Sequence, residues 1–347
     1  MRLMLNRSWT TPLCALALAA VGCAADSCAP STKPPATQQA QAGLRSVVFH
    51  GMCDASGAVV LGGSRFAVGD DEDNVLRVYD SGGGEPLYMI DVSPALDLPH
   101  KKKTPEADIE AATRFEDHAL WLTSHGRNSK GQLQPGRLRF FATTAPAEGS
   151  HLTPVGVPYQ GLLEDLLGDA ELARFQLAEA SELAPKAGGV NIEGMTRRVG
   201  GEGVLIGFRN PRPGGKALVV PLLNPLALVR EHDAERARLG TPQLVDLGGL
   251  GVRSLSQWRG RYLVIAGAMD QEAPSRLFVW DGADRVQLIA DAPLTGFNPE
   301  AFVSHDDSED VLLLSDDGSV EVDGEPCKKL KDRRRKQFRG VWVHVSP

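Results

Sequence analysis

The chain has 347 residues, a formal net charge of −7 and 42% hydrophobic residues. This composition is typical of a folded globular protein, and its mildly acidic balance gives no indication of nucleic-acid binding. One basic run, at residues 328–339, is interpreted as a solvated loop, with a contact to anionic headgroups or polysaccharide as the alternative.

The N-terminus has the features of a targeting signal. Arg2 and Arg7 are followed by an apolar stretch that is too short to span a bilayer as a transmembrane helix. The stretch ends at Ala20-Val21-Gly22-Cys23, which resembles a bacterial lipobox. We therefore predict a signal peptide at residues 1–22 and a lipid on Cys23, with plain secretion as the alternative.

Residues 23–43 are rich in Ala, Ser, Thr, Pro and Gln, a composition that cannot bury a core. They are predicted to form a flexible tether, with a root-mean-square reach of roughly 25 Å, in front of a folded domain at residues 44–347. This organisation predicts an extracytoplasmic protein of the cell envelope. It would face the periplasm or lie at the cell surface, and contact the membrane only through its lipid anchor.

The cysteines divide along the chain. Cys14 lies in the signal peptide, whereas Cys23 and Cys28 belong to the lipid site and the tether. Only Cys53 and Cys327 lie in the folded domain. In an oxidising compartment we expect these two to form a disulfide, worth roughly 4–5 kcal/mol in a chain-entropy description. The alternatives are two buried thiols or a pairing of Cys53 with Cys28.

Strand patterns dominate the folded domain. Alternating apolar residues predict strands at 64–69 and 75–80, and the acidic segment 70–74 between them is typical of a hairpin turn. Further strands are predicted, in chain order, at 138–142, 216–220, 276–280 and 340–344. Apolar residues at helical spacing predict two helices, interpreted as insertions on connecting loops, at 162–183 and 226–239.

A short pattern recurs along this domain: Asp or Asn, then Ile or Pro, then Glu, then a small residue. Its copies, each followed about ten residues later by an apolar run, lie at 108–111, 191–194 and 298–301. A fourth segment, 251–254, has Arg at the Glu position, and a looser fifth copy lies at 51–54. Self-similarity at an uneven spacing of roughly 45–85 residues predicts an all-β fold, a single β-propeller. We expect about six blades, with five to seven allowed, and place the sixth at 131–189.

Equivalent positions in successive blades of a propeller face one another across the central channel. Glu110, Glu193 and Glu300 are therefore expected to converge at one level, and such carboxylates repel one another unless a cation neutralises them. One solution is Ca²⁺, bound by the three Glu side chains and by the residues two positions before them, Asp108, Asn191 and Asn298. The alternatives are Arg253, whose guanidinium can hold two carboxylates, or Glu side chains that each cap a turn of their own blade.

The loops after two of the apolar runs carry basic residues. His125 and Arg127 follow the first run, and Arg209 takes the corresponding place after the second. Together with Arg253 they would suit a small anionic ligand, such as a phosphate or a carboxylate. A hydrolytic Ser124–His125 pair is disfavoured, because adjacent residues of a strand point to opposite faces. A loop-ordering hydrogen bond is the simpler role for His125.

The acidic segment 70–74 offers the oxygen ligands that Ca²⁺ prefers but lacks the central Gly of an EF-hand loop, so we interpret it as an exposed hairpin turn, with a Ca²⁺ site as the alternative. The chain contains no Gly-rich phosphate loop, no zinc-ligand spacing and no Cys-x-x-Cys motif.

Taken together, these motifs resemble the bacterial domain-of-unknown-function family numbered 3616. The matching pieces lie at 53–56, 70–74, 76–79, 106–110, 124–127, 191–194, 207–211, 223–225, 246–251, 298–301 and 314–318. The resemblance implies a propeller and brings no established activity. The Asn-Ile-Glu-Gly piece is also similar to phytase-related, esterase-like propellers, in which acidic residues hold calcium. Fold does not determine function, so this likeness remains an analogy.

Three functions are compatible with these features. The first is a lipid-anchored propeller, expected to be a monomer, that binds a small anionic or polar ligand at one channel mouth without chemistry of its own. The second is a calcium-dependent hydrolase of phosphate or carboxylic esters, in which Arg127, Arg209 and Arg253 would orient the substrate. The third is a protein-interaction scaffold that uses the blade edges. No residue is assigned a catalytic role.

Overall fold

The computed structural model describes residues 45–146, 151–230, 235–269, 273–289 and 294–346. The predicted signal peptide, the lipid site Cys23 and the tether at 23–43 lie outside the described residues. None of the helices in these ranges has the length and apolarity that a membrane crossing requires.

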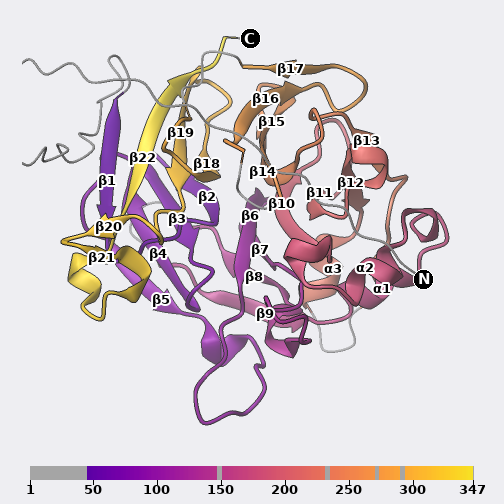
Figure 1. The fold of residues 1–347 in the computed structure, drawn as a ribbon, viewed down its shortest axis with the longest axis horizontal. Helices are drawn as coiled ribbons and strands as arrows, with labels where there is room; N and C mark the ends of the chain where they lie inside the picture. The colour runs from indigo at the N-terminus through magenta and orange to yellow at the C-terminus, as the bar shows by residue number, and fades with distance from the viewer. Residues whose placement is uncertain (1–44, 147–150, 231–234, 270–272, 290–293, 347) are drawn as a thin grey trace, which may run out of the picture. The chain divides into compact units, whose positions relative to one another are not determined.

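The described residues form five four-stranded antiparallel sheets, which are the blades of a β-propeller (Figure 1). The first blade contains β2 (Gly57–Gly62), β3 (Arg65–Gly69), β4 (Val75–Asp80) and β5 (Tyr88–Asp91). The second contains β6 (Ile109–Phe115), β7 (His118–Thr123), β8 (Phe140–Thr144) and β9 (Pro154–Tyr159). The third contains β10 (Asn191–Arg197), β11 (Val204–Asn210), β12 (Ala217–Leu222) and β13 (Gln243–Val245).

The fourth blade contains β14 (Gly251–Trp258), β15 (Arg261–Gly267), β16 (Arg276–Trp280) and β17 (Val286–Leu288). The fifth has the strand order β18 (Pro299–Val303), β19 (Asp310–Ser315), β22 (Gln337–His344) and β1 (Ser46–His50). The remaining elements are the hairpin β20 (Glu321–Val322) and β21 (Glu325–Pro326), and the helices α1 (Leu162–Gly168), α2 (Leu177–Ser181) and α3 (Pro225–Arg230).

The first strands of the sheets, β2, β6, β10, β14 and β18, form a closed ring. Each packs against the next, and β18 packs against β2. Alternating buried side chains of neighbouring blades fill the space between the sheets, as in the cluster that joins β11 and β12 to β14 and β15. These five strands therefore surround the central axis, and the copies of the repeated motif lie at or next to their starts.

The all-β propeller fold is confirmed, but the expected number of about six blades is wrong: the described residues form five, the lower limit allowed. The segment 131–189 is not a blade. It supplies β8 and β9 to the second blade and then forms α1 and α2. Its apolar side chains Leu162, Leu166 and Leu177 are buried in a core shared with the second and third blades. A helical connection thus takes the place of the strands that a sixth blade needs.

Most of the other predicted elements are present. The strands predicted at 75–80 and 276–280 coincide with β4 and β16, and the other predicted strands overlap β3, β8, β12 and β22. The helix predicted at 162–183 is divided into α1 and α2. Of the helix predicted at 226–239, α3 covers the first part, and residues 231–234 lie outside the described residues.

Both ends of the folded domain meet in the fifth blade. Strand β1 is the outer strand of that blade and pairs antiparallel with β22, which closes the ring. Beside this closure Cys53, which lies between β1 and β2, forms a disulfide with Cys327, and their Cα atoms are 5.9 Å apart. Both cysteines are buried against Leu330. The ring is therefore closed by a strand pair and by a covalent bond.

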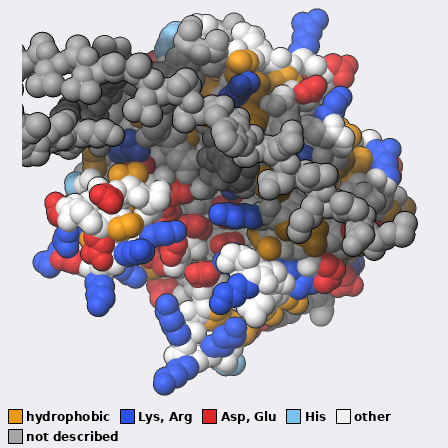
Figure 2. Space-filling model, viewed as in Figure 1, with side chains coloured by type: hydrophobic (Ala, Val, Ile, Leu, Met, Phe, Trp, Pro, Cys, Tyr) orange, Lys and Arg blue, Asp and Glu red, His pale blue; other side chains and the backbone are white. Residues whose placement is uncertain are grey.

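The basic run at 328–339 lies next to acidic side chains. Arg333 pairs with Asp73 at 3.6 Å, and Arg335 pairs with Asp323 at 3.1 Å. Figure 2 shows charged side chains of both signs side by side near the β20–β21 hairpin, at the left of the view. These exposed pairs agree with a solvated, locally neutralised loop.

Candidate functional site

The repeated motif places its central residue at the same structural position in four blades. The inner strands β6, β14 and β18 each have one register shift against their partners, and β10 has two, the first of which leaves Arg209 of β11 unpaired. The residues of the inner strands left unpaired at these β-bulges are Glu110, Glu193, Arg253 and Glu300. A bulge re-aims a side chain that would otherwise alternate with its neighbours. These four residues are thus brought toward one mouth of the channel, as the repeat predicted.

One half of this mouth is an ion-pair network around Arg253. The guanidinium of Arg253 is 2% exposed, contacts Glu300, and lies 3.6 Å from Glu193 between Nε and Oε2. Arg209 Nη1 lies 2.8 Å from the other carboxylate oxygen of Glu193. Glu193 and Glu300 are therefore neutralised by arginine rather than free to bind a metal, which is the arrangement that the sequence left as an alternative.

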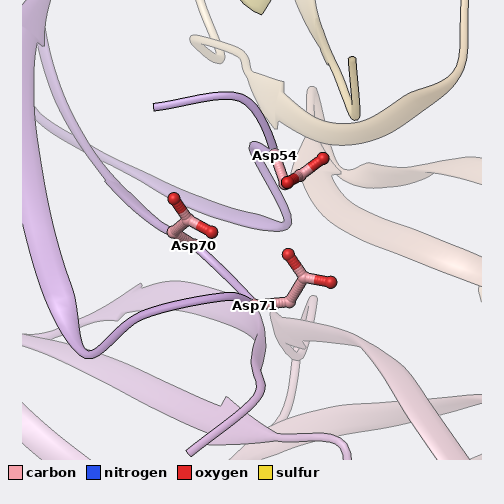
Figure 3. A group of neighbouring side chains, drawn as sticks. All are labelled: Asp54, Asp70 and Asp71. Carbon is pink, nitrogen blue, oxygen red and sulfur yellow. The ribbon is translucent and has the colours of Figure 1, made fainter. Parts of the chain in front are cut away.

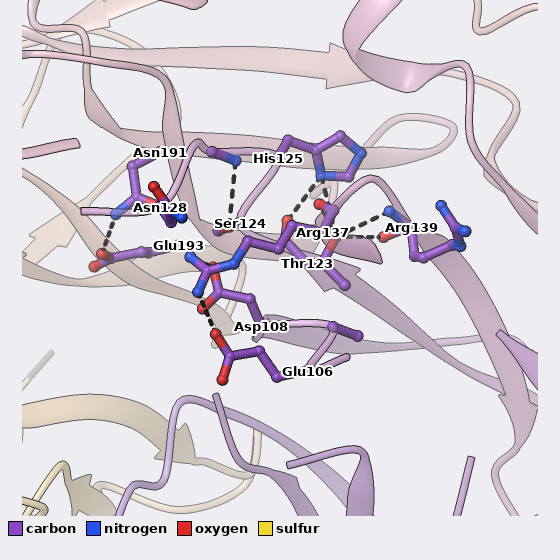
Figure 4. Close-up of polar contacts among 12 residues, drawn as sticks. Glu106, Asp108, Thr123, Ser124, His125, Asn128, Arg137, Arg139, Asn191 and Glu193 are labelled. Carbon is purple, nitrogen blue, oxygen red and sulfur yellow. Dashed lines mark hydrogen bonds and ion pairs between the residues drawn. The ribbon is translucent and has the colours of Figure 1, made fainter. Parts of the chain in front are cut away.

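Two amides belong to the same network. Asn191 Nδ2 donates to Glu193 Oε1 at 2.6 Å (Figure 4). Asn298 accepts a hydrogen bond from Arg253 and donates to Asp316 Oδ2 at 3.0 Å. The predicted metal-ligand set is therefore divided: Asn191, Asn298 and two of the three Glu side chains lie in the arginine network.

The other half of the mouth is an acidic cluster. Carboxylate oxygens of Asp71, Asp108 and Glu110 lie within 4.8 Å of one another, and so do those of Asp54, Asp70 and Asp71. Figure 3 shows the side chains of Asp54, Asp70 and Asp71 around a common space. Asp71 belongs to both groups and joins the first blade to the second. We call these five residues, Asp54, Asp70, Asp71, Asp108 and Glu110, the acidic cluster.

Burial raises the pKa of every member of the acidic cluster. Burial, and then the charge of Asp73, raise the pKa of Asp70 to about 7. Burial raises the pKa of Asp54 to about 11, helped by its hydrogen bond with Asp316. It also raises the pKa of Asp108 to about 6, against the opposing charge of Arg137.

The two remaining carboxyls, those of Asp71 and Glu110, have the fewest nearby groups that could neutralise their charge. Burial and the charge of Asp70 raise the pKa of Asp71 well above its ordinary value, and burial and the charge of Glu193 do the same for Glu110. Within the described residues neither carboxylate has a basic side chain within ion-pair distance. Asp71 Oδ1 is also buried without a hydrogen-bond partner in that part of the chain. The cluster must therefore keep protons or take up a cation.

The sequence alone did not assign Arg137, Asp316, Asp54, Asp70 or Asp71 to the site. It predicted an exposed turn at 70–74, whereas Asp70 is buried and belongs to the acidic cluster. Arg137 Nη1 lies 2.8 Å from Asp108 Oδ2 and also contacts Glu106 (Figure 4). Asp316 follows β19 just as Asp70 follows β3, so both lie at the end of a second strand. Comparing the ends of second strands between blades would have identified these carboxylates.

Two of the predicted anion-binding residues do not lie free at the mouth. Arg127 donates from Nε to Ser181 O at 2.7 Å and from Nη1 to Gly131 O at 3.2 Å, which ties its loop to α2. His125 Nδ1 lies 2.8 Å from the carbonyl oxygen of Thr123. His125 therefore orders its loop through a hydrogen bond, which is the simpler of the two roles given by the sequence analysis.

The other two predicted anion-binding residues, Arg209 and Arg253, do lie at the mouth. Arg209 is paired with Glu193, and Arg253 is paired with Glu300. Ser124 is not paired with His125, since its hydroxyl interacts with Asp108 and accepts from Gly126 N at 3.2 Å. Among the described residues the arrangement thus offers neither a free anion-binding arginine at this mouth nor a Ser–His pair.

We expect the buried imidazole of His125 to make folding depend on pH. Burial lowers the pKa of His125 from 6.5 to about 4. As the pH falls below 6.5, the unfolded chain therefore takes up a proton before the folded chain does, and stability is lost down to about pH 4. The full loss for this group is roughly 3 kcal/mol. Unfolding by denaturant at about pH 7 and about pH 4.5 should show that acidification destabilises His125→Asn less than the unchanged protein, because the contribution of the acidic cluster is common to both. Equal pH dependences would contradict this.

Comparison with known proteins finds a family model that matches part of the chain, and it indicates no activity. Residues 155–310 match the family described as "Protein of unknown function (DUF3616)", in agreement with the resemblance of the motifs. The matched segment runs from β9 into β19 and includes Glu193, Arg253 and Glu300, whereas the acidic cluster lies before it. No curated protein matches the chain.

Several solved structures resemble this chain at low similarity. A putative oxidoreductase (glucose dehydrogenase) from Thermus thermophilus is 13% identical, with a TM-score of 0.42, over 87% of this chain and 100% of that one. Myxococcus xanthus glutaminyl cyclase is 12% identical, with a TM-score of 0.41, over 87% and 99%. The PQQ-bound aldose sugar dehydrogenase of Streptomyces coelicolor is 10% identical, with a TM-score of 0.38, over 87% and 99%. At these values none of them indicates the function of this chain.

Proposed function

We propose that this chain, a five-bladed propeller whose residues 155–310 match the family of unknown function DUF3616, binds a divalent cation in its acidic cluster. The cation would lie between Asp71, Asp108 and Glu110. It would in turn hold a small anionic or polar ligand at the channel mouth. The observation that carries the proposal is the approach of three carboxylates within 4.8 Å, two of which have no basic partner among the described residues.

Ca²⁺ is the cation that suits these groups best. It takes six to eight oxygen ligands at about 2.3–2.6 Å, so that oxygens on opposite sides of the ion are about 5 Å apart. Carboxylate oxygens within 4.8 Å of one another are compatible with that spacing. Mg²⁺ demands a near-ideal octahedron and keeps most of its water, so an all-protein acidic cluster suits it less.

The bound cation also supplies the site for a ligand. Three carboxylates leave coordination positions that water or an oxygen of the ligand can take. An anionic or hydroxylated ligand would then bind through the metal, because the arginines of this mouth are already paired with Glu193 and Glu300. This is a binding function, and it requires no nucleophile. Attachment of the propeller to a membrane through Cys23 remains a prediction from the sequence.

Thermal unfolding tests the cation site. Removing divalent ions with EDTA and then adding millimolar Ca²⁺ is expected to raise the midpoint by about 5 °C or more, because a ligand that binds only the folded state stabilises it. Asp71→Asn should abolish most of this rise. It should not lower the midpoint in EDTA, because it removes a repelling charge. Asp284→Asn, on an exposed loop of the fourth blade, is the matched control and should respond like the unchanged protein.

The absence of any Ca²⁺-dependent shift, or an undiminished shift in Asp71→Asn, would rule out this proposal. The hydrolase that the sequence also allowed would need turnover at the same site. Release of nitrophenol from its phosphate and acetate esters, measured with and without Ca²⁺, separates that function from binding alone.

A further inference from the structure

The channel has a second polar cavity at its other end. It has a volume of about 310 Å³ and is lined by residues of all five inner strands, β2, β6, β10, β14 and β18, together with the turns that follow β6 and β18. This is at the lower limit of the size typical of ligand pockets. Its residues Thr113, Thr196 and Ser256 come three residues after Glu110, Glu193 and Arg253, so they lie about 10 Å farther along the strands. The cavity is thus separate from the acidic cluster.

Hydroxyl groups that connect neighbouring blades surround this cavity. Thr113 Oγ1 accepts from Arg197 N at 3.2 Å, and Thr196 Oγ1 accepts from Gln257 N at 2.7 Å. Ser256 Oγ and Ser304 Oγ are 2.7 Å apart and join the fourth blade to the fifth. Thr113 Oγ1 also donates to Arg114 O at 3.5 Å, whereas Thr196 Oγ1 acts only as an acceptor within the described residues, so its O–H group remains available to donate to a ligand.

Two arginines stand at the same position of adjacent inner strands. Arg114 in β6 and Arg197 in β10 each follow a cavity threonine, and both are exposed. Arg114 Nη1 donates to Leu61 O at 2.6 Å. Arg114 pairs with no carboxylate within the described residues, and no side-chain partner of the Arg197 guanidinium lies there either. Unlike the arginines of the other mouth, neither guanidinium is paired with a carboxylate in the described part of the chain. Arg197 can therefore bind an oxyanion bidentately, and Arg114 can add its remaining N–H groups beside the bond to Leu61 O.

The acidic residues of the rim do not cancel these donors. Asp306 Oδ1 accepts from Arg259 N at 2.7 Å, and Asp306 Oδ2 lies 3.5 Å from Gln257 Nε2. Glu116, at the turn after β6, is exposed and is the one other carboxylate among the described cavity residues. Donors from Arg, Thr and Ser therefore predominate around the cavity, and donors recognise the oxygens of an anion.

We propose that this second cavity binds a small hydroxylated oxyanion, whose carboxylate or phosphate contacts Arg114 and Arg197 and whose hydroxyls contact the Thr and Ser side chains. The volume admits a molecule of about the size of one sugar acid or sugar phosphate. This site is separate from the cation site proposed at the opposite mouth, so an experiment can disprove either proposal without affecting the other.

Isothermal titration of the protein with D-gluconate, glucose 6-phosphate and glucose tests this inference. Saturable binding of gluconate or glucose 6-phosphate is expected, weakened about tenfold or more in Arg197→Gln, because a charge-assisted hydrogen bond is lost. The acid that binds more tightly identifies the preferred head group, and glucose should bind more weakly than either. Arg198→Gln is the matched control, since Arg198 is the adjacent residue and donates to Glu202 O instead of lining the cavity.

Three results would overturn the inference: no binding of either acid, equal binding of glucose, or affinities that Arg197→Gln leaves unchanged. The response of the melting midpoint to Ca²⁺ should be the same in Arg197→Gln as in the unchanged protein. That measurement also verifies that the variant is folded.

Discussion

Replacing Arg253 with Met is expected to lower the free energy of unfolding by about 3–5 kcal/mol, the cost of breaking a buried ion pair by removing one partner. Arg253 is 2% exposed and contacts both Glu193 and Glu300. Without it, Glu300 loses its cation and Glu193 keeps only Arg209. Two buried carboxylates then face each other without sufficient compensation. Unfolding by denaturant measures the difference directly.

Further substitutions in the same network test whether the uncompensated charges of Glu193 and Glu300 cause this loss of stability. When Glu193→Gln and Glu300→Gln are added to Arg253→Met, most of the lost stability should return, because the uncompensated charges are gone. Arg276→Met, an exposed arginine at the start of β16, is the control and should change stability by less than about 0.5 kcal/mol. A loss of less than about 1 kcal/mol in Arg253→Met would show that the network does not stabilise the ring.

Removing the disulfide with Cys53→Ala and Cys327→Ala is expected to cost about 5 kcal/mol. The two cysteines are 274 residues apart in the chain, so their bond restricts nearly the whole unfolded domain. It also reinforces the blade that the strands β1 and β22 close. Denaturant unfolding of the oxidised protein and of the variant measures the difference.

The single variants provide the control for this prediction. Either Cys53→Ala or Cys327→Ala alone removes the whole bond, so each should cost nearly as much as both together. Costs that add independently, or a total below about 1 kcal/mol, would contradict a closing role for the disulfide.

The repeated motif predicted the propeller and the strands that surround its channel, but not the number of blades. It marks the starts of the inner strands, and its central residues do come together at one mouth. The sequence could not show that each of these residues is the extra residue of a β-bulge, because a bulge depends on the register of the partner strand. The prediction of a sixth blade was wrong, because the length of the segment 131–189 does not distinguish additional strands from the α1–α2 insertion.

The division of the mouth into two halves follows from the order of the blades. Arg253, in the fourth blade, lies between Glu193 of the third and Glu300 of the fifth, and it takes both. Glu110 lies instead beside the first blade, which contributes Asp70 and Asp71 from the end of β3. Asp70 and Asp71 are outside the repeat, so the approach of Asp71 to Glu110 depends on a ring of five that the sequence did not specify.

The roles of His125 and Arg127 also depend on tertiary contacts. Arg127 is held by Ser181 and Glu182 at the end of α2, more than fifty residues later in the chain. Nothing in the local pattern around Arg127 distinguishes such a structural arginine from one that binds a ligand.

The most direct test of the cation site is a crystal structure of the protein grown with Ca²⁺, with the ion located by its anomalous scattering. The account predicts one ion between Asp71, Asp108 and Glu110, with carboxylate oxygens at about 2.3–2.6 Å. An acidic cluster without an ion at millimolar Ca²⁺, or ions bound only by surface carboxylates, would contradict it.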